Sequence, residues 1–386
     1  NRYSLFADAG FLRLQIGDSY PVFPTLVMSG RRVRGFTGNL ALGFFNLDVT
    51  LGQGLRSIEG RVDSTRAVDS AAIPSLPTNT KLLRDTTYEY FTSGTYARNF
   101  LAVRPSFGSG ENFQLGFTYM KAKDDVASIS YGVTPEENLL VGTDILIAFD
   151  DQRFKLEGQA SLGLSNKDIS GGNFSDADYD SLEAQNEDLG KQLKKIRPLA
   201  EQLITVNENL FPTNPVGTGL PGVAFEGMLS LNYLNNYAQA GFFRRGAGYR
   251  SLGNEFLQTD IQGFIVSDRI RMFTNRVFLS VSYERKSDNT ADTKSETRTF
   301  SNLNTSLTLA LPNIPGLTIG YGHYSLLSDR DVARPYLPDS IAARPGTERR
   351  KSADDATGRF FIGSSYDFNA LARQNLTMNL SIANRD

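Results

Sequence analysis

Apolar and polar residues alternate with a period of two along most of this chain. In RVFLSVSYERKSDN, residues 276–289, the side chains of Val277, Leu279 and Val281 fall on one side of an extended backbone, and Ser280 and Ser282 fall on the other. Successive side chains of a β-strand point to opposite faces, so this pattern predicts a strand. It recurs in about fourteen segments, which we predict as strands at residues 3–16, 37–52, 87–107, 112–122, 138–149, 153–165, 222–234, 237–250, 259–272, 276–286, 299–311, 317–327, 357–368 and 376–385.

The connections between these segments are alternately long and short. From the second strand onward the longer ones are 53–86, 123–137, 166–221, 251–258, 287–298 and 328–356, and the short ones are 108–111, 150–152, 235–236, 273–275, 312–316 and 369–375. Antiparallel neighbours place successive connections at opposite ends of a sheet, so the short turns share one end and the long loops share the other. This asymmetry is typical of outer-membrane barrels, and a Greek-key sandwich has no reason to show it.

Together with stretches such as TNRVFLSVSYERKSDN, these patterns resemble the outer-membrane β-barrels of Gram-negative bacteria. The resemblance covers most of the chain apart from residues 166–221, and LRLQIGDSYPVFPTLVMSGRRVRG (12–35) is similar to segments of large, uncharacterised barrels. It implies an all-β fold, a single antiparallel transmembrane β-barrel of about 14 or more strands over residues 1–386. It also implies a porin-like protein in the bacterial outer membrane. Because the chain starts with Asn1 rather than Met, we expect a mature or partial portion.

Composition excludes several other classes of protein. The 386 residues carry a formal charge of −2, which argues against a nucleic-acid binder. There is no Cys, so disulfide scaffolds and thiol chemistry are excluded. The sequence contains no apolar run of the roughly 18 residues that a membrane-spanning helix needs.

The alternation assigns side chains to two faces. The apolar face of a barrel strand meets lipid, and because the chain has no Trp, Phe and Tyr are expected in the interfacial girdles. The lipid-facing or girdle candidates are Phe113, Tyr119, Phe154, Tyr233 and Tyr283. The lumen-lining candidates are Arg269, Arg271, Asp268, Glu226, Glu284, Lys155 and Glu157. Lipid rejects an arginine near its midplane at about 2 to 4 kcal/mol, so Arg269 and Arg271 are expected to point inward, either paired with carboxylates or as an anion-selective lining.

Residues 175–211 interrupt the strand pattern with helical spacing. The apolar positions that form the stripe are Leu182, Leu189, Leu193, Ile196, Leu203 and Val206, and Pro198 is expected to kink or split the helix. The stripe is consistent with three interpretations of the insertion: a cap over the long-loop mouth, a plug in the lumen, or a docking surface for another envelope protein.

The sequence contains few candidates for catalytic or metal-binding residues. The single His323 has no partner at metal-ligand spacing and is interpreted as a wall or rim residue, with Ser325 two residues away. Three acidic pairs lie in polar connections and are interpreted as solvated turns rather than Ca²⁺ sites: Asp124 with Asp125, Asp150 with Asp151, and Asp354 with Asp355. We therefore expect no enzyme, no metal and no cofactor.

The sequence predicts passage or export of polar solutes through the lumen, with the lipid bilayer as the principal partner. A non-conducting scaffold that anchors a secretion, surface or adhesion assembly is the alternative, and a soluble or extracellular β-structure is the second. Phe278 falls on the polar face of its strand and is expected to pack against inward-folded loops, as in a partly filled barrel.

Overall fold

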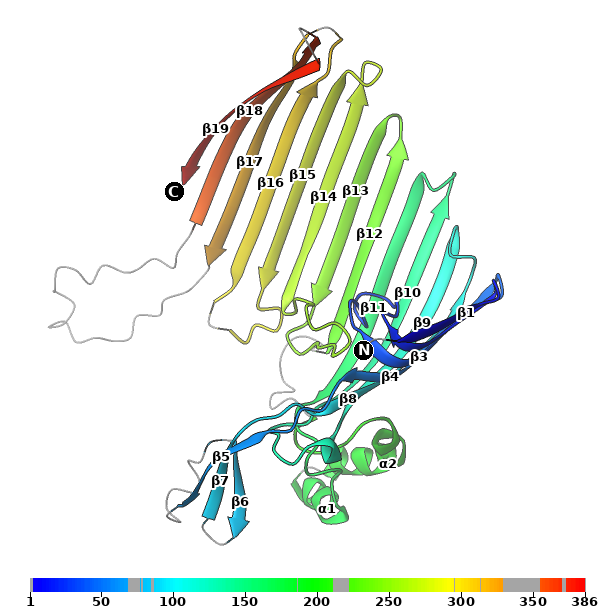
Figure 1. Ribbon diagram of the computed structural model, residues 1–386, viewed down its shortest axis with the longest axis vertical. Coiled ribbons are helices and arrows are strands. Elements are labelled where there is room, and N and C mark those ends of the chain that lie inside the picture. The colour runs from blue at the N-terminus through cyan, green and yellow to red at the C-terminus, as the bar shows by residue number, and fades with distance from the viewer. Residues whose placement is uncertain are drawn as a thin grey trace, which may run out of the picture.

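One antiparallel sheet dominates the computed structural model, which describes residues 3–68, 77, 79–84, 87–185, 187–210, 222–294, 296–312, 314–328, 355–369 and 373–385. Sixteen strands form it in the order β1-β2-β3-β4-β8-β9-β10-β11-β12-β13-β14-β15-β16-β17-β18-β19, and a second sheet has the order β5-β7-β6. Figure 1 shows the large sheet running from the N-terminal to the C-terminal strands in chain order. The all-β, antiparallel fold predicted from the sequence is confirmed.

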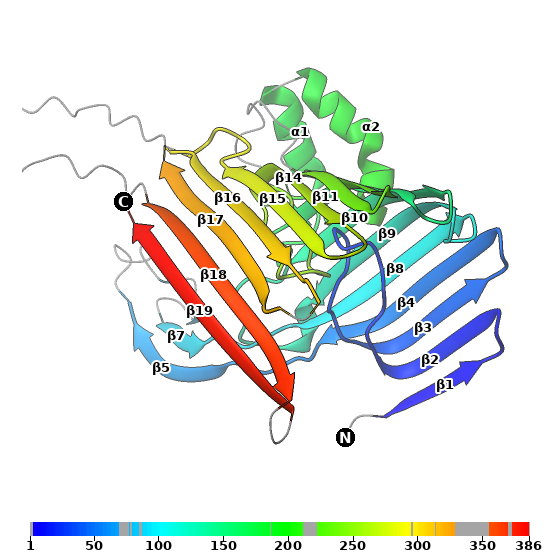
Figure 2. The same cartoon turned by 90° about the horizontal axis from the view of Figure 1, so that it is seen from above.

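The first half of the large sheet contains β1 (Ser4–Asp8), β2 (Leu12–Ser19), β3 (Val33–Ala41), β4 (Phe45–Leu55), β8 (Ala97–Phe107), β9 (Phe113–Asp125), β10 (Glu137–Phe149) and β11 (Phe154–Asn166). The second half contains β12 (Val223–Tyr233), β13 (Asn236–Arg245), β14 (Ile261–Met272), β15 (Val277–Asp288), β16 (Arg298–Leu309), β17 (Gly316–Ser328), β18 (Asp355–Asn369) and β19 (Arg373–Arg385). Figure 2 shows that the sheet is strongly curved, with β1 and β19 at its two edges.

Two predicted strands near the N-terminus are in fact hairpins. Segment 3–16 folds back at Gly10, whose φ is +81°, and a further turn at Gly43, also at +81°, separates β3 from β4. Glycine adopts positive φ without the steric cost that a Cβ imposes, and the carboxylate of Asp8 accepts a hydrogen bond from the Gly10 amide. Segment 87–107 likewise divides into β7 (Thr87–Thr92) and β8. These corrections raise the strand count and extend the alternation of short and long connections to the first strand.

The two ends of the sheet differ as predicted. Short turns follow β1, β3, β8, β10, β12, β14 and β16, and longer connections follow β2, β4, β9, β11, β13, β15 and β17. Much of the connection 328–356 and part of 369–375 lie outside the described residues. The connection after β4 holds the small sheet of β5 (Arg61–Ala67), β6 (Thr80–Arg84) and β7.

The helical insertion is confirmed as two helices, α1 (Asp176–Gln185) and α2 (Glu187–Leu203), with Pro198 inside α2. No helix of the described residues is both long and apolar enough to cross a membrane.

Candidate functional site

Residues 20–32, which connect β2 and β3, fold against one face of the large sheet. Leu26 and Met28 are fully buried there (0% exposed), in a cluster with Phe100 of β8 and Met120 of β9. We call this face the inner face and the opposite one the outer face. Figure 2 shows residues 20–32 (dark blue) on the concave side and α1 and α2 on the other.

A second inward connection, residues 246–258, holds this segment in place. Tyr249 donates its hydroxyl hydrogen bond to the Leu26 carbonyl at 2.8 Å, and the Ser251 hydroxyl donates to the Val27 carbonyl. Burial raises the pKa of the Tyr249 hydroxyl to about 12, so the group stays protonated and remains a donor. The two connections are therefore fixed to each other by buried hydrogen bonds.

Gly253 makes the close approach of these connections possible. A Cβ at this position would lie 2.7 Å from the Val27 carbonyl oxygen, which is closer than such atoms come. The Ser29 amide donates to the Gly253 carbonyl across the same contact. Backbone meets backbone here, so a larger residue would push residues 20–32 off the inner face.

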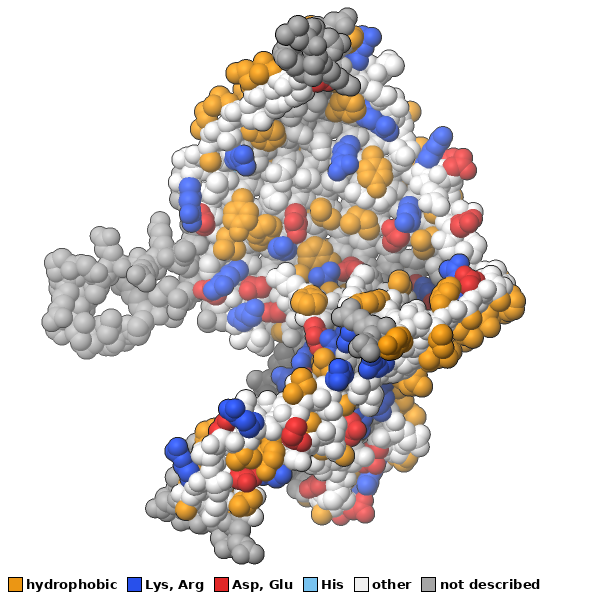
Figure 3. Space-filling view, viewed as in Figure 1, with side chains coloured by type: hydrophobic (Ala, Val, Ile, Leu, Met, Phe, Trp, Pro, Cys, Tyr) orange, Lys and Arg blue, Asp and Glu red, His pale blue; other side chains and the backbone are white. Residues whose placement is uncertain are grey.

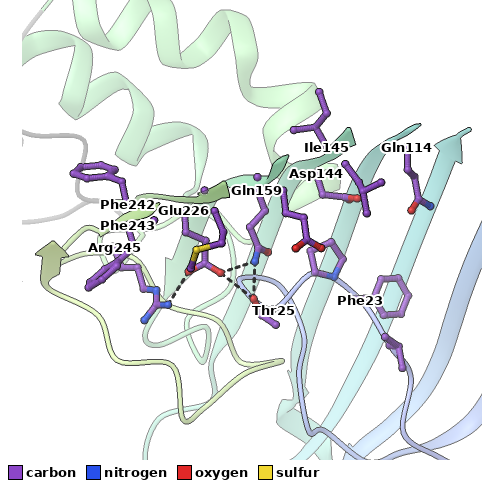
Figure 4. A pocket seen from close by; sticks show the side chains of 18 of the residues that line it. Phe23, Thr25, Gln114, Asp144, Ile145, Gln159, Glu226, Phe242, Phe243 and Arg245 are labelled. Atoms are coloured by element: carbon purple, nitrogen blue, oxygen red, sulfur yellow. Dashed lines mark hydrogen bonds and ion pairs between the residues drawn. The ribbon is translucent and has the colours of Figure 1, made fainter. Parts of the chain in front are cut away.

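A polar network ties the tip of residues 20–32 to β11, β12 and β13. Gln159 donates to the Thr25 hydroxyl at 2.6 Å, and Thr25 donates to a Glu226 carboxylate oxygen at 3.1 Å. Arg245 donates to the other Glu226 oxygen at 2.7 Å (Figure 4). Gln159 also donates to Glu226. The carboxylate thus has partners from β11, from β13 and from the inward segment, which satisfies its half-buried charge.

Two further arginines cross-link the inner face. Arg104 of β8 donates to Asp144 at 2.9 Å through Nε and to Asp48 of β4 at 3.1 Å. Nearer the long-loop end, buried Arg98 pairs with Asp124 at 2.7 Å and with Glu136 at 3.1 Å. Each guanidinium bridges strands on the same face and fixes their side chains.

A pocket of about 560 Å³ lies on the inner face, between Arg104 and the network around Glu226. Its walls carry both charge and apolar surface, and they include Phe23, Asp144, Glu157, Glu226, Phe243 and Arg245. Figure 4 shows Phe23 and Thr25 on the inward segment, opposite the strands that carry Asp144, Gln159 and Glu226. A mixture of fixed polar groups and apolar wall suits a small polar solute with an apolar part.

The inner face of the later strands is more basic and less paired. By register, Arg269 and Arg271 of β14 and Arg359 of β18 all point inward, and all three are exposed. Among the described residues none of the three has an ion-pair partner. In the view of Figure 3, charged side chains are spread over the part of the sheet formed by β12 to β19, and hydrophobic side chains gather along the edge formed by β1 to β4.

Cross-strand register places the predicted residues on the two faces. The inner face carries Lys155, Glu157, Glu226, Glu284, Arg269 and Arg271, and the outer face carries Phe113, Tyr119, Phe154, Tyr233 and Tyr283. Phe278 lies on the inner face, opposite Arg271.

Asp268 is a correction. It lies opposite Ala238 and Val281 on the outer face, which also carries Phe264 and Val266. Its neighbour Arg269 points inward, and successive strand residues point to opposite faces, so both cannot line the lumen. The prediction treated Asp268 as an inward carboxylate that pairs with the arginines, and the pleat separates them.

The helical insertion does not plug the inner face. Leu203 and Val206 pack in a cluster with Leu139 and Tyr119, whose side chains belong to the outer face. Leu182 is half-buried and Ile196 is exposed, whereas the side chains of Leu189 and Leu193 lie outside the described part of the structure. The plug reading is therefore wrong for the described helices, because their anchor is on the opposite side of the sheet.

Residues 20–32 and 246–258 take the inward position that sequence reasoning missed. A signal was present in YPVFPTLVMSG: an apolar run without alternation, interrupted by Pro21 and Pro24. Neither a strand nor an exposed turn accounts for such a run, since it is too apolar for water and too broken for a sheet.

The remaining candidate residues that the structure describes do not come together in one site. Asp124 pairs with Arg98, Asp150 and Asp151 form a turn with positive φ, and Asp354 lies outside the described residues. His323 is on the outer face, its ring stacked on Tyr321 with centroids 6.4 Å apart. Within the described part of the chain, no three His, Asp or Glu side chains are grouped so as to hold a metal ion.

Comparison with known proteins gives distant structural similarities, three of which are described below. No family model matches the sequence, and no curated protein matches it. Among solved structures, Pseudomonas aeruginosa OpdQ is 11% identical with a TM-score of 0.38, covering 99% of this chain and 80% of its own. Acinetobacter baumannii OccAB3 is 12% identical with a TM-score of 0.38, covering 98% of this chain and 76% of its own. Acinetobacter baumannii OccAB2 is 12% identical with a TM-score of 0.39, covering 99% of this chain and 76% of its own. Superpositions with TM-scores below 0.5 do not establish a common fold, so the architecture rests on the strand pairing of this chain.

Proposed function

We propose that this chain forms an outer-membrane channel for polar solutes, in which the sheet closes between β1 and β19 and the inner face lines the path. The observation that carries the proposal is the division of one continuous sheet into an apolar outer face and a charged inner face. Hydrocarbon leaves no partner for the free backbone groups of an edge strand, so a sheet that spans a membrane must close.

The outer face supports a membrane rather than water as its surroundings. Large apolar side chains on it remain about half exposed, including Val141 (52%), Leu162 (52%) and Val266 (48%). Soluble monomers rarely leave contiguous apolar patches larger than a few hundred Å² uncovered. This favours a bilayer over the soluble alternative.

The two halves of the inner face suggest different roles. On β8 to β13 the charges are paired and residues 20–32 narrow the space, so this half serves as the fixed wall of a constriction. On β14 to β18 the exposed Arg269, Arg271 and Arg359 have no ion-pair partner in the part of the chain that the structure describes, and they can meet solute. A lining of such arginines favours anions or the carboxylate of a small zwitterion.

Conductance in planar bilayers tests this function. The folded protein is expected to give discrete channels with anion preference, and Arg269→Glu with Arg271→Glu is expected to reverse that preference. Lys195→Glu, an exposed charge on α2, is the matched control and is expected to leave selectivity unchanged. Unchanged selectivity in the double variant would refute the arginine lining.

The second candidate is a non-conducting scaffold, and the inward packing of residues 20–32 favours it. If these residues obstruct the whole path, the protein inserts and folds but does not conduct. Gly253→Leu, which displaces the segment, then opens a conductance that the unmodified protein lacks. Failure to partition into detergent micelles would contradict both functions.

A further inference from the structure

The α1–α2 hairpin is anchored to the outer face of the sheet at its long-loop end. Its C-terminal side packs in the cluster of Leu139, Ile204 and Val206, together with Tyr119 and Leu203. The anchor is also polar, through a 2.7 Å hydrogen bond from Lys121 to the Leu203 carbonyl and one of 2.9 Å from the Thr205 amide to Glu137. The hairpin is thereby anchored to the outer-face side chains at the ends of β9 and β10.

Ion pairs within the hairpin engage much of its polar surface. Lys194 of α2 bonds Asp180 and Glu183 of α1, and Arg197 bonds Asp176. The Arg197 guanidinium also lies 4.6 Å from the ring centroid of Tyr179. The hydrogen bond from Arg197 lowers the pKa of the Asp176 carboxyl. The hydrogen bonds that Lys194 donates to Asp180 and Glu183 raise the pKa of its ammonium group. Both shifts keep the groups charged.

An apolar stripe on α2 is left uncovered. Leu203 occupies the anchored end of the stripe, and Leu199 and Ile196 continue it at spacings of four and three residues, on the same helix face. Leu199 is 64% exposed and Ile196 52%. The stripe therefore begins in the cluster on the outer face and runs away from the sheet with no protein partner among the described residues.

We propose that Ile196 and Leu199 insert into the lipid leaflet next to the long-loop end, so that the hairpin lies at the boundary between headgroups and acyl chains. This inference rests on the proposed membrane location of the sheet. The occupant is lipid because the stripe is continuous with the outer face, where the apolar side chains of the strands are themselves uncovered. Amphipathic helices in such a position bury their apolar face about 5 to 10 Å into the interface.

The absence of Trp from the sequence makes a clean test possible, since a single introduced Trp is then the only indole in the protein. Three variants are reconstituted separately in phosphatidylcholine vesicles: Leu199→Trp on the stripe, Leu229→Trp in the middle of β12 on the outer face, and Glu187→Trp on the opposite side of α2. Fluorescence is measured with lipids brominated either near the headgroup or near the chain ends.

Leu199→Trp is expected to emit at shorter wavelength than Glu187→Trp and to lose most intensity with bromine near the headgroup. Leu229→Trp is expected to be quenched by the deeper bromine, and Glu187→Trp by neither. If Leu229→Trp is quenched and Leu199→Trp is not, the sheet spans the bilayer and the inference is overturned. A blue-shifted but unquenched Leu199→Trp would assign the stripe to another protein chain and also overturn it. If Leu229→Trp escapes quenching, the proposed function itself fails.

Discussion

At the scale of single residues, the two-residue turn between β12 and β13 carries backbone strain. Leu234 and Asn235 have φ values of 53° and 61°, as a type I′ hairpin turn requires, and the Leu234 side chain is 97% exposed. A non-glycine residue in this region pays roughly 1 to 2 kcal/mol because its Cβ approaches the following carbonyl. The exposed leucine side chain gives no burial in return.

Leu234→Gly is therefore expected to stabilise the folded protein by about 1 kcal/mol. Urea unfolding in vesicles measures the change. Asn232→Gly, two residues earlier in the regular part of β12, is the control and is expected to destabilise by about 0.5 to 1 kcal/mol. Equal losses from the two variants would show that the turn residue is not strained.

Loss of Arg104 is expected to weaken the inner face. It bonds Asp48 and Asp144 at once, and its side chain is only 12% exposed. Arg104→Met leaves two carboxylates without their cation and is expected to cost about 3 kcal/mol. Adding Asp48→Asn and Asp144→Asn removes those charges and should restore most of the loss in the same unfolding assay; if it does not, the arginine acts through packing alone.

At the scale of elements, a salt bridge outside the strands joins the loops 246–260 and 289–297. Asp260 accepts hydrogen bonds from the Thr290 amide and from Lys294. Partial burial acts to raise the pKa of Asp260, but the Lys294 and Thr290 hydrogen bonds outweigh it and hold that pKa below its ordinary value. A folded-state pKa below the unfolded one stabilises the protein above the unfolded value, about 3.9 for Asp, and the stabilisation is lost as pH falls through the folded pKa.

Asp260→Asn should accordingly lower stability at neutral pH and make little difference in acid. The measurement is the urea midpoint of both proteins from pH 7 down to below about pH 3.9. The gap between the two curves is expected to narrow as pH falls. A gap that stays constant would mean that the carboxylate charge does not hold these loops together.

Elements also differ in how well the sequence predicts them. Strands such as β15 were predictable because strict alternation of side chains is a property of the strand itself. The hairpins at Gly10 and Gly43 were missed although the apolar positions change phase at both turns, for example from Leu40 and Leu42 to Leu47 and Val49. Each turn is so short that the strands on its two sides look like one segment. The inward fold of residues 20–32 depends on contacts with β8, β9 and Tyr249, which are distant in sequence, so local pattern could not place it.

At the scale of the whole molecule, the face on which each side chain lies could be predicted from the sequence, but the contacts between side chains on that face could not. Period two assigned the girdle candidates and Arg269 with Arg271 to opposite faces, because a single pleat orders every residue of a strand. Which charges on the inner face are paired follows from neighbouring strands, as with Glu226 and Arg245, and the pairing register becomes known only with the fold. The same limit applies to the helical hairpin, whose stripe fits either face equally well.

The face assignment itself makes the strongest prediction, because two neighbouring residues of β12 should respond in opposite ways. Leu229 points outward and Ser230 inward, both near the middle of the strand. If the outer face meets hydrocarbon, Leu229→Arg places a charge near the bilayer midplane and is expected to cost about 2 to 4 kcal/mol. Ser230→Arg places the same charge on the hydrated inner face and should change stability by less than about 0.5 kcal/mol.

Both variants are compared by urea unfolding in the same vesicles, so that chain position and added charge are matched. In a soluble sheet Leu229→Arg would meet water and the two variants would differ little. Equal stabilities would therefore contradict the membrane location. A larger loss for Ser230→Arg would mean that the inner face is packed too tightly for a solute path, which would leave the scaffold as the remaining function.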